Sequence, residues 1–377
     1  MVKILITGGA GFIGSNLAEK SAGAGHEITI LDSLLPQIHG EDPKRSPQCQ
    51  RAMTAGRLVV ADICDRAALT EALAGQDVVI HLAAETGTGQ SMYEIHRYNT
   101  VNVGGTATLL DILANDPART VRKIVVASSR SIYGEGKYLS PELGAVYPTA
   151  RRESDLLAGL FDPIYPGAGP LTVAPTSEDS MIHPSSVYGI TKSTQEQLVM
   201  TVGPTLDIAP VALRYQNVYG PGQSLANPYT GILSIFSTLI RQGKPINIFE
   251  DGLESRDFVY IDDVVAATMQ AATDPRSDNR VFNVGSGVGT TVLTVVDELM
   301  TAYDREVATT VSGNFRLGDI RHNIADLTAI RDALGFEPSV KFATGVRRFA
   351  NWVQTQEISS DRYEASLDEM REKRLLK

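Results

Sequence analysis

The chain begins with a short apolar run that turns at once through closely spaced glycines. The run Lys3–Thr7 is typical of a buried strand, and Gly8, Gly11 and Gly14 follow it at three-residue spacing. A turn of this kind lets the backbone approach a phosphate, because the N–H groups and the dipole of the following helix point at the anion. Gly8 permits the tight turn, Gly11 permits the close approach, and Gly14 lets the helix pack on the strand.

An acidic residue ends the next strand. The second apolar run, residues 27–31, is followed by Asp32, eighteen residues after Gly14. A carboxylate at this position accepts hydrogen bonds from the adenosine ribose hydroxyls and repels a 2′-phosphate. An ordinary turn with a surface aspartate is the alternative, but strand, turn, helix, strand and acid all occur in register here. The pattern therefore predicts NAD, rather than NADP, as the dinucleotide.

Composition and charge exclude several classes of protein. The formal net charge is -10 and no dense Lys/Arg stripe occurs, which argues against a nucleic-acid or anionic-membrane partner. No apolar run is long enough to span a membrane, and a core strand at the first residues leaves no room for a signal peptide. Cys49 and Cys64 have neither the number nor the spacing of a zinc site or a disulfide framework. We therefore expect a cytoplasmic protein without a metal.

Apolar runs alternate with helical patterns up to about residue 130. Such a rhythm predicts a doubly wound parallel sheet, a Rossmann-type α/β fold, with a smaller C-terminal lobe in a chain of 377 residues. The further strands are expected at residues 58–61, 78–82, 123–127 and 211–215, and the helices near residues 66–74, 102–115, 186–202, 261–273, 292–303 and 328–334.

Residues 135–183 differ from the rest of the chain. They are rich in Pro, Gly, Ser and acidic residues, with one short helical pattern near residues 151–160. This length without clear periodicity suggests an insertion over the cleft. We expect residues 1–210 to form the NAD-binding domain and residues 211–377 to form mainly a substrate-binding lobe interleaved with it. The polar tail from about residue 357 is expected to be a peripheral helix or frayed.

Two groups of residues could carry chemistry. Tyr188 and Lys192 lie four residues apart at the start of a predicted helix, so both side chains point the same way. A nearby ammonium group lowers the pKa of a tyrosine and makes it a base, although a surface pair would be the default for these two residues alone. Ser128 and Ser129 end the buried strand at residues 123–127, at the sheet edge where ligands bind. One of these hydroxyls could share a proton with Tyr188.

Taken together, these segments resemble the extended short-chain dehydrogenase/reductase family, specifically its nucleotide-sugar epimerase/dehydratase branch. The resemblance extends to about residue 350, with every segment in family order. The segments are GGAGFIG (8–14), HLAA (81–84), NVGGT (102–106), SSRSIYG (128–134), YGITK (188–192), RYQNVYGPGQ (214–223), SRDFVYIDD (255–263) and NVGSG (283–287).

The resemblance implies a role for each matching residue. Tyr188 corresponds to the catalytic base, Lys192 to its partner and Ser129 to the third catalytic group. Arg256 and Arg316 correspond to two pyrophosphate-binding arginines, which suits a guanidinium because its fork grips phosphate oxygens at two points. The remaining substrate contacts are assigned to Gln90, Ser91, Arg130, Ser131 and Asn217. The remaining cofactor contacts are assigned to Gly8, Gly11, Phe12, Ile13, Gly14, Asp32, Asp62, Ile63, Leu82, Ala83, Ala84 and Asn102.

The same resemblance narrows the reaction. In this branch, the tyrosine removes the proton of the sugar 4-hydroxyl while NAD oxidises C4 to a ketone. The 4,6-dehydratases also carry an Asp-Glu pair directly after the catalytic hydroxyl, where this chain has Arg130 and Ser131. These side chains cannot replace two carboxylates in a proton shuttle. We therefore expect a 4-epimerase, in which the keto sugar rotates in the pocket and is reduced again by the NADH formed in the first step.

The substrate is indicated by less specific segments. Residues 86–94 and the insertion resemble bacterial epimerases that interconvert dTDP-L-rhamnose and dTDP-6-deoxy-L-talose, mainly through Gln90, Ser91 and Met92. Asn323 replaces a tyrosine that often lies near the sugar. The alternatives are a UDP-hexose or UDP-uronate 4-epimerase, a nucleotide-sugar 4-reductase or dehydratase, and a non-catalytic NAD-sensing protein. The helices at 102–115 and 186–202 resemble the pair through which the family forms homodimers.

Overall fold

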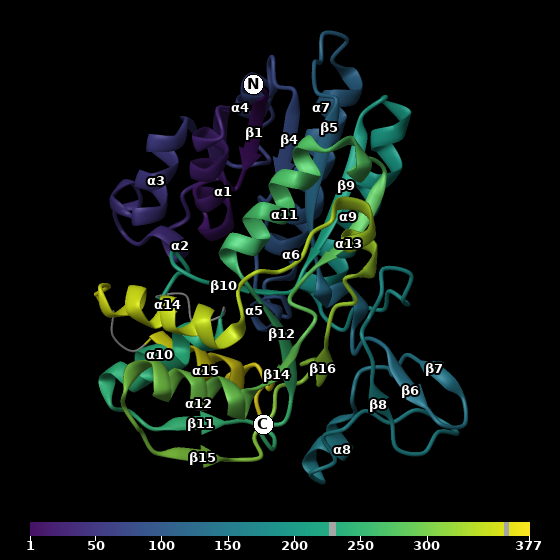
Figure 1. Cartoon of the computed structure of the whole chain (residues 1–377), viewed down its shortest axis with the longest axis vertical. Coiled ribbons are helices and arrows are strands. Elements are labelled where there is room, and N and C mark those ends of the chain that lie inside the picture. Colours follow the sequence, from purple (N-terminus) through teal and green to yellow (C-terminus); the bar gives the residue numbers. More distant parts are fainter. Residues whose placement is uncertain (226–230, 358–361) are drawn as a thin grey trace.

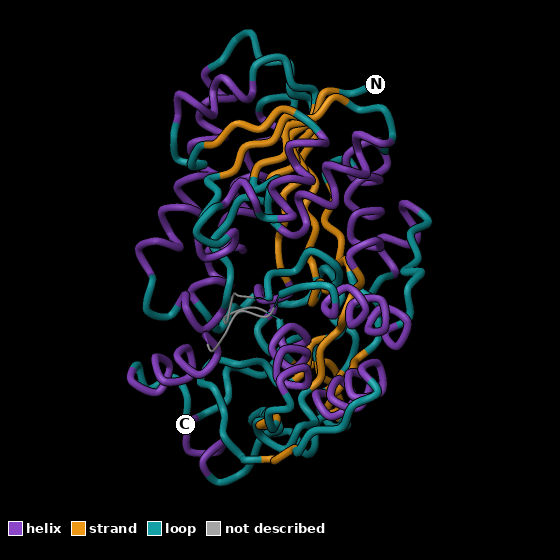
Figure 2. The backbone as a smooth tube through the Cα atoms, turned by 90° about the vertical axis from the view of Figure 1, so that its left-hand side faces the viewer, coloured by secondary structure: helices purple, strands orange, loops and turns teal. Residues whose placement is uncertain are grey.

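The computed structural model describes residues 1–225, 231–357 and 362–377. A seven-stranded sheet of order β13-β9-β5-β4-β1-β2-β3 forms its upper part (Figure 1, Figure 2). All neighbouring strands in this sheet run parallel, which confirms the predicted doubly wound α/β fold. The strands are β1 (Lys3–Thr7), β2 (Glu27–Asp32), β3 (Arg57–Val60), β4 (Val78–His81), β5 (Lys123–Ser129), β9 (Ala209–Tyr215) and β13 (Arg280–Val284).

Helices cover both faces of this sheet, because its strands are apolar on both sides. Ile4 and Ile6 point into one core, whereas Leu5 between them points into the other. The first core is covered by α1 (Phe12–Gly23), α3 (Pro47–Ala55) and α11 (Ile261–Thr273), and the second by α4 (Arg66–Leu73), α7 (Gly105–Asn115) and α9 (Val187–Thr205).

The strand order reverses at β1, which pairs with β2 on one side and with β4 on the other. Loops that leave the carboxyl ends of β1 and β4 therefore diverge to opposite faces of the sheet. A crevice opens at such a reversal, and open α/β sheets bind their ligands there. Because the glycine turn comes directly after β1, it lies at this crevice.

The second half of the chain forms the lower lobe in Figure 1 and also contributes to the large sheet. Strand β13 and helix α11 return to the upper part, so the two parts interleave along the chain. The lobe contains β10 (Asn217–Tyr219), β11 (Ile246–Ile248), β12 (Ser255–Tyr260), β14 (Gly289–Thr291), β15 (Thr309–Val311), β16 (His322–Asn323), α10 (Ile232–Gln242), α12 (Val292–Tyr303) and α14 (Phe342–Gln354). Helix α13 (Thr328–Leu334) lies in the upper part, against β13 (Figure 1).

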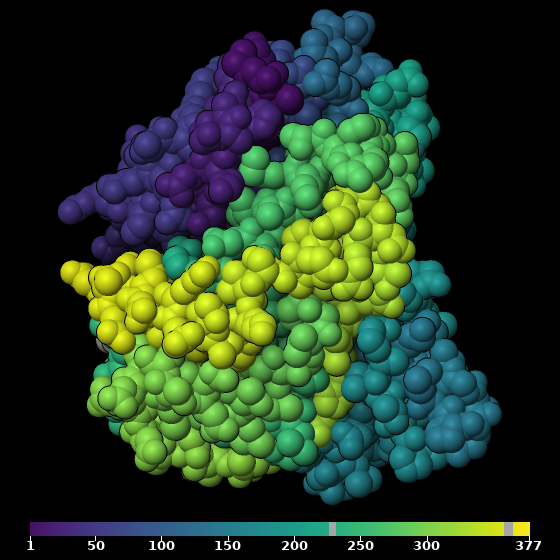
Figure 3. All heavy atoms as spheres, viewed as in Figure 1, coloured from purple at the N-terminus to yellow at the C-terminus, as the bar shows by residue number. Residues whose placement is uncertain are grey.

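The insertion at residues 135–183 lies beside the lower lobe, as the blue block at the lower right of Figure 3. Its small antiparallel sheet is formed by β6 (Tyr138–Ser140), β7 (Gly144–Val146) and β8 (Thr172–Val173), with α8 (Glu153–Leu157) nearby. The expectation that it covers the cleft is wrong, because none of its residues lines the cavity described below. A buried Arg151 holds it to the lobe through two hydrogen bonds of 2.8 Å to Glu250.

The polar tail forms α15 (Arg362–Glu372) and then pairs with the lobe instead of fraying. Leu367, Met370 and Leu376 are buried there against Phe249. This docking was not expected, because three apolar side chains scattered in a polar segment give a weak sequence signal. Over the residues that are described, we find no helix with both the length and the apolar character needed to cross a membrane.

Candidate active site

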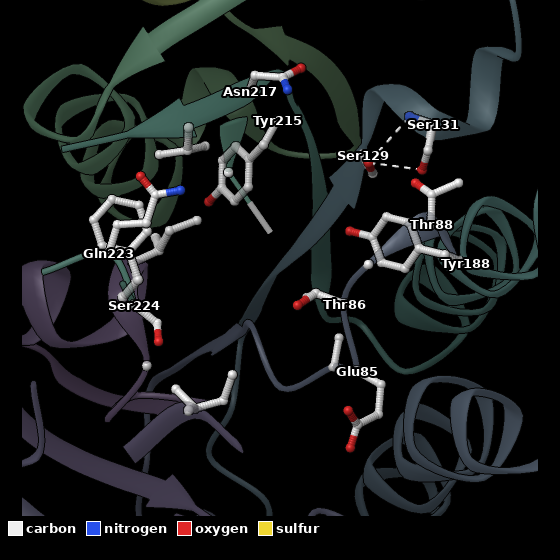
Figure 4. Close-up of a pocket in the computed structure, with 18 of the residues that line it drawn as sticks. Glu85, Thr86, Thr88, Ser129, Ser131, Tyr188, Tyr215, Asn217, Gln223 and Ser224 are labelled. Atoms are coloured by element: carbon white, nitrogen blue, oxygen red, sulfur yellow. Dashed lines mark hydrogen bonds between the residues drawn. The ribbon is translucent and has the colours of Figure 1, made fainter. Parts of the chain in front are cut away.

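A cavity of about 600 Å³ extends from the carboxyl edge of the large sheet into the lower lobe. Its upper end is lined by the glycine turn, Asp32, Asp62 and Ile63, and its lower end by Arg256 and Arg316. Tyr188 and Ser129 lie on one side of it, facing Asn217 and Gln223 on the other (Figure 4). The further predicted residues that line it are Phe12, Ile13, Leu82, Ala83, Ala84, Arg130, Ser131 and Lys192.

The glycine turn has the backbone shape that the sequence predicted. Gly8 adopts φ +69°, a left-handed conformation that favours glycine, and a Cβ there would lie 2.8 Å from the backbone nitrogen of Ala83. A Cβ on Gly14 would lie 2.3 Å from the Gly8 carbonyl oxygen. Helix α1 therefore starts close against the turn, with its first N–H groups directed at the cavity.

Asp32 is fixed at the end of β2 by the backbone. Its Oδ2 accepts a hydrogen bond of 2.9 Å from the N–H of Ala10, and its Oδ1 accepts one of 2.9 Å from the N–H of Leu34. His39, which also lines the cavity, places its Nε2 3.9 Å from Asp32 Oδ1. The carboxylate thus faces the space in which a dinucleotide held by the glycine turn would place its adenosine ribose.

The two serines at the end of β5 have different partners. Ser128 donates a hydrogen bond of 2.5 Å to Glu196 Oε2, so its hydroxyl is used within the core. Ser129 instead shares a hydrogen bond with the Tyr188 phenol, and its Oγ accepts from the Ser131 hydroxyl at 2.9 Å. Residue chemistry alone left both serines open, and the family resemblance pointed to Ser129. The structure brings Ser129, rather than Ser128, together with Tyr188.

The environment of Tyr188 acts on its pKa in opposite directions. Burial raises the pKa, whereas the hydrogen bond from Ser129 and the positive charge of Arg130 lower it. We had expected Lys192 to be the cation that lowers it, with a net decrease. The structure shows a net increase, because burial is the larger effect. Burial also lowers the pKa of the Arg130 guanidinium to about 10.

Lys192 lies one turn of α9 beyond Tyr188 and is buried. Burial lowers the pKa of its ammonium group to about 7, against the opposing influence of Glu196. Its Nζ donates a hydrogen bond of 2.7 Å to Gln195 Oε1, and Gln195 in turn donates to Thr106 at 2.8 Å. This chain of bonds holds the lysine at the cavity wall, on the same helix as Tyr188.

The lower end of the cavity is rich in polar atoms that lack partners. Within residues 1–225, 231–357 and 362–377, the buried atoms Arg316 Nε, Asn217 Oδ1 and Arg130 Nη1 form no hydrogen bond. Buried polar groups in proteins are nearly always paired, so orphans that face one cavity indicate a polar ligand. Arg316 also lies over the ring of Phe249, at 5.0 Å from its centre, which fixes the direction of the guanidinium.

Three predicted contact residues lie behind the cavity wall. Asn102 is fully buried and donates from Nδ2 to the Glu85 carbonyl and to Thr191. Ser91 accepts a hydrogen bond of 3.0 Å from the N–H of Tyr188, and Gln90 accepts one of 3.2 Å from Gln37. None of the three is among the residues that line the cavity. They support the loops that carry the lining residues.

The structure also shows lining residues that we did not predict. Gln216 and Gln223 lie inside the quoted segment RYQNVYGPGQ, and both present an unpartnered amide oxygen, counted over the described chain. Within the described residues, Asn247 of β11 also presents an unpartnered amide oxygen, and Glu254, directly before β12, presents a carboxylate oxygen that accepts no hydrogen bond. Because Gln216 and Gln223 lie inside a matched segment, their polar side chains could have suggested them as contacts. No local signal marks the other two, because the lobe alone brings them to the cavity.

The residues at the upper end fit NAD. A Cβ on Gly8 or Gly14 would fill the cradle that these residues form. The lack of a side chain at both positions therefore leaves room for a pyrophosphate to approach the backbone. Asp32 offers a fixed acceptor for ribose hydroxyls and a negative charge against a 2′-phosphate. We find no cluster of three or more His, Cys, Asp or Glu suited to a metal in the described part of the chain.

Comparisons with known proteins agree with this geometry. The model of the NAD dependent epimerase/dehydratase family matches residues 4–154 and 162–285. The chain is 38% identical to a dTDP-L-rhamnose 4-epimerase of Burkholderia thailandensis, over 93% of this chain and 94% of that one. Two solved structures are similar. One is a UDP-glucose 4-epimerase of Thermotoga maritima with UDP-glucose (29% identity, TM-score 0.74, 93% and 98% covered). The other is a UDP-glucuronic acid 4-epimerase of Bacillus cereus with UDP-glucuronic acid and NAD (25%, 0.76, 93% and 99%).

Proposed function

The chain belongs to the NAD-dependent epimerase/dehydratase family, and from this premise we propose that it is an NAD-dependent nucleotide-sugar 4-epimerase. One observation carries the proposal. Tyr188 shares a hydrogen bond with Ser129 in a cavity that has a dinucleotide turn at one end and two arginines at the other. With NAD bound at the turn and the diphosphate of a sugar nucleotide bound by the arginines, the sugar would lie beside Tyr188, which would act as the base.

The residues of the chain perform the proton and binding steps. Tyr188 would take the proton of the sugar 4-hydroxyl, and Ser129 would donate a hydrogen bond to the same oxygen. Bound NAD would supply the reversible oxidation at C4. Arg256 and Arg316 would hold the diphosphate, while the sugar has few fixed contacts and can turn. Once the keto sugar has rotated, the opposite face of C4 would lie toward the NAD site for the return of the hydride, and Tyr188 would return the proton to the C4 oxygen.

Elimination of water is disfavoured by the side chains beside Ser129. Dehydration across C5 and C6 needs an acid and a base, and carboxylates are suited to both roles. Arg130 is a buried cation here, and the Ser131 hydroxyl already donates to Ser129. With these side chains in place, the 4-keto sugar keeps its C6 substituent. This supports epimerisation over dehydration.

The substrate pair that we propose is dTDP-L-rhamnose and dTDP-6-deoxy-L-talose. The similarity to the Burkholderia thailandensis enzyme, which extends over 93% of the chain, supports it. A UDP-uronate is the second candidate. The buried Arg130 Nη1, which has no partner among the described residues, would suit a carboxylate at C6, and the Bacillus cereus neighbour was solved with UDP-glucuronic acid.

A panel of dTDP- and UDP-linked sugars tests the function, with the configuration of the product at C4 as the readout. We expect turnover of dTDP-L-rhamnose without net NADH release. Replacing Tyr188 by Phe should lower kcat by about 10²- to 10⁴-fold, because general base catalysis contributes this much. Tyr147→Phe, in the insertion and away from the cavity, is the control.

Four outcomes would contradict parts of the proposal. Turnover of UDP-sugars with no dTDP-sugar accepted would exclude the rhamnose assignment. Stoichiometric NADH release would indicate a dehydrogenase or reductase. Undiminished activity of Tyr188→Phe would exclude the catalytic role, and complete lack of turnover would favour a sensing protein.

We further propose a homodimer formed through α7 and α9, located in the cytoplasm. Exposed apolar side chains on and near these helices support the dimer, namely Met92, Ile95 and Ile190. Both cysteines are free thiols, which suits a reducing compartment. Sedimentation velocity tests the dimer: Ile190→Glu should yield a monomer with the same near-UV spectrum.

A further inference from the structure

The last residues of the chain form a strap, defined here as residues 362–377, across the lower end of the cavity. Phe315 and Lys377 exchange backbone hydrogen bonds of 3.0 and 3.1 Å, and the N–H of Leu317 donates to the Leu375 carbonyl at 3.0 Å. Lys377 Nζ lies 2.9 Å from Glu153 Oε1 of the insertion. The strap is thus fixed on both sides of Arg316, a residue that would bind the diphosphate.

A small apolar cluster orients the strap. Leu367, Met370 and Leu376 are each at most 5% exposed, and they pack with Phe249 and Leu375. This cluster is separate from the two large cores on either side of the sheet. The strap therefore depends on its own contacts at the cavity for its position.

Among the strap residues whose side chains are described, Met370 is the one that lines the cavity. Its sulfur lies 3.5 Å from the point where a Cβ of Gly89 would be. Gly89 follows Thr88, whose side chain lies next to Tyr188 and Ser131 in Figure 4. Through this contact, Met370 lies near the place where the sugar would be oxidised.

The side chains that lead from Gly89 to Tyr188 are polar or charged, namely Thr86, Thr88, Ser129, Arg130 and Ser131, whereas Met370 adds an apolar group beside Phe249 and Leu317. A methionine offers an apolar, adaptable surface that packs well against C–H groups and gives no hydrogen bond of ordinary strength to a hydroxyl. It would therefore favour an apolar substituent on the sugar.

We propose that Met370 is a specificity-determining residue of the sugar site. The strap holds its thioether against the C6 end of the hexose, so the enzyme prefers a 6-deoxy sugar, which ends in a methyl group, over a sugar with a hydroxymethyl or carboxylate group. This inference rests on the proposed function. It adds the reason why a site whose reacting groups are polar would select a deoxy sugar.

The test compares dTDP-L-rhamnose with dTDP-L-mannose, which differs from it only by the hydroxyl on C6. We expect the wild type to prefer the deoxy sugar in kcat/KM by at least about tenfold, the discrimination typical of one small group in an apolar contact. Met370→Gln, similar in size but polar, should lower this ratio by about tenfold. Met370→Leu should keep the ratio, and Glu372→Gln, an exposed change on the same strap, should leave it unchanged.

A purely structural role for Met370 predicts a different effect on the ratio of the two kcat/KM values. In that case Met370→Gln would change both substrates equally, or neither, and the unchanged ratio would overturn the inference. If the wild type epimerises neither sugar, the proposed function fails, and calorimetry then measures the two dissociation constants in the same variants. A ratio of dissociation constants that is the same in Met370→Gln and wild type would overturn the inference independently of turnover.

Discussion

Two cations of different kinds lie near the phenol of Tyr188. Lys192 is buried on the same helix and is bonded to Gln195, with its pKa lowered to about 7. Arg130 comes from the turn after β5 and keeps its charge, because its pKa of about 10 is still well above neutral. Of the two, Arg130 is the charge that counteracts the effect of burial on the tyrosine.

The charge of Arg130 should therefore appear in the pH profile. Replacing Arg130 by Gln removes a positive charge that lowers the pKa of Tyr188, so the pKa of the phenol should rise. Since the phenolate is the active form of the base, the acidic inflection of kcat/KM should move to higher pH. A shift of one unit would lower activity at pH 7 by about tenfold. Arg130→Lys keeps the charge and should keep the inflection; an unmoved inflection in Arg130→Gln would assign the arginine to binding alone.

Asp32 is a second residue whose chemistry is fixed locally, because two backbone N–H groups orient its carboxylate. In the Asp32→Ala variant, the ribose hydroxyls lose a charged acceptor, a contact worth about 1.5–3 kcal/mol. We expect the preference for NAD over NADP to fall by at least about tenfold in calorimetric binding. The exposed Asp332→Ala on α13 is the control. An unchanged preference would mean that another group distinguishes the 2′-hydroxyl of NAD from the 2′-phosphate of NADP.

At the scale of elements, the glycine turn and α1 act as one unit. The helix approaches the turn so closely that Gly14 has no room for a side chain, since a Cβ would meet the Gly8 carbonyl oxygen at 2.3 Å. The contact is with backbone, which cannot rotate away as a side chain could. The approach of α1 to β1 therefore depends on this one position.

Gly14→Ala should consequently disturb the whole element. We expect a loss of stability of about 1–3 kcal/mol from overpacking, together with weaker NAD binding, measured by urea unfolding and by calorimetry. Gly23→Ala is a matched control in the same helix, because a Cβ there meets no atom within 4 Å. Equal behaviour of the two variants would show that the turn can move without cost.

The insertion shows how an element can be misplaced by sequence reasoning. Its polar, irregular composition predicts a surface segment, and the structure agrees on that point. Its position beside the lobe depends on the pairing of Arg151 with Glu250, residues 99 positions apart. Glu250 itself adopts φ +49°, and its two arginine partners, Arg151 and Arg321, hold it there.

Over the whole molecule, this insertion and the lobe share a group of buried charges. Glu135 lies 3.3 Å from Arg151 and accepts a hydrogen bond of 2.7 Å from the N–H of Arg321. Burial nevertheless raises the pKa of Glu135 to about 7. Because the folded protein binds this proton more tightly than the unfolded chain does, Glu135 stabilises the fold most at low pH. Its contribution declines as the pH rises from about 4.5 through 7.

Glu135→Gln should remove this dependence, since the amide stays neutral. The stability of the variant relative to the wild type should increase with pH between about 5 and 7, by at most about 1.4 kcal/mol per pH unit. Urea unfolding at pH 5, 6 and 7 measures it, with the exposed Glu71→Gln as the control. A difference that stays constant over this range would contradict the raised pKa.

The sequence by itself determined the parallel sheet, the glycine turn and Asp32, because these depend on residues close together in the chain. Runs such as Lys3–Thr7 are apolar on both faces, and only a sheet covered on both sides buries them. The spacing of Tyr188 and Lys192 is local in the same sense. The matched segment at residues 255–263 also identified Arg256, and the family resemblance suggested Arg316, which lies outside the quoted segments.

Only the tertiary structure decided which side chains meet at the cavity. The family resemblance pointed to Ser129, but only the fold shows the physical reason: a buried carboxylate 68 residues away engages Ser128, whereas Ser129 contacts Tyr188. Gln90 and Ser91 lie behind the wall, whereas Met370, from a polar tail, forms part of it. Packing between segments far apart in the chain fixes these positions, so no local sequence pattern predicts them. The glycine turn could therefore be predicted at the first residues, but the wall of the sugar site could not.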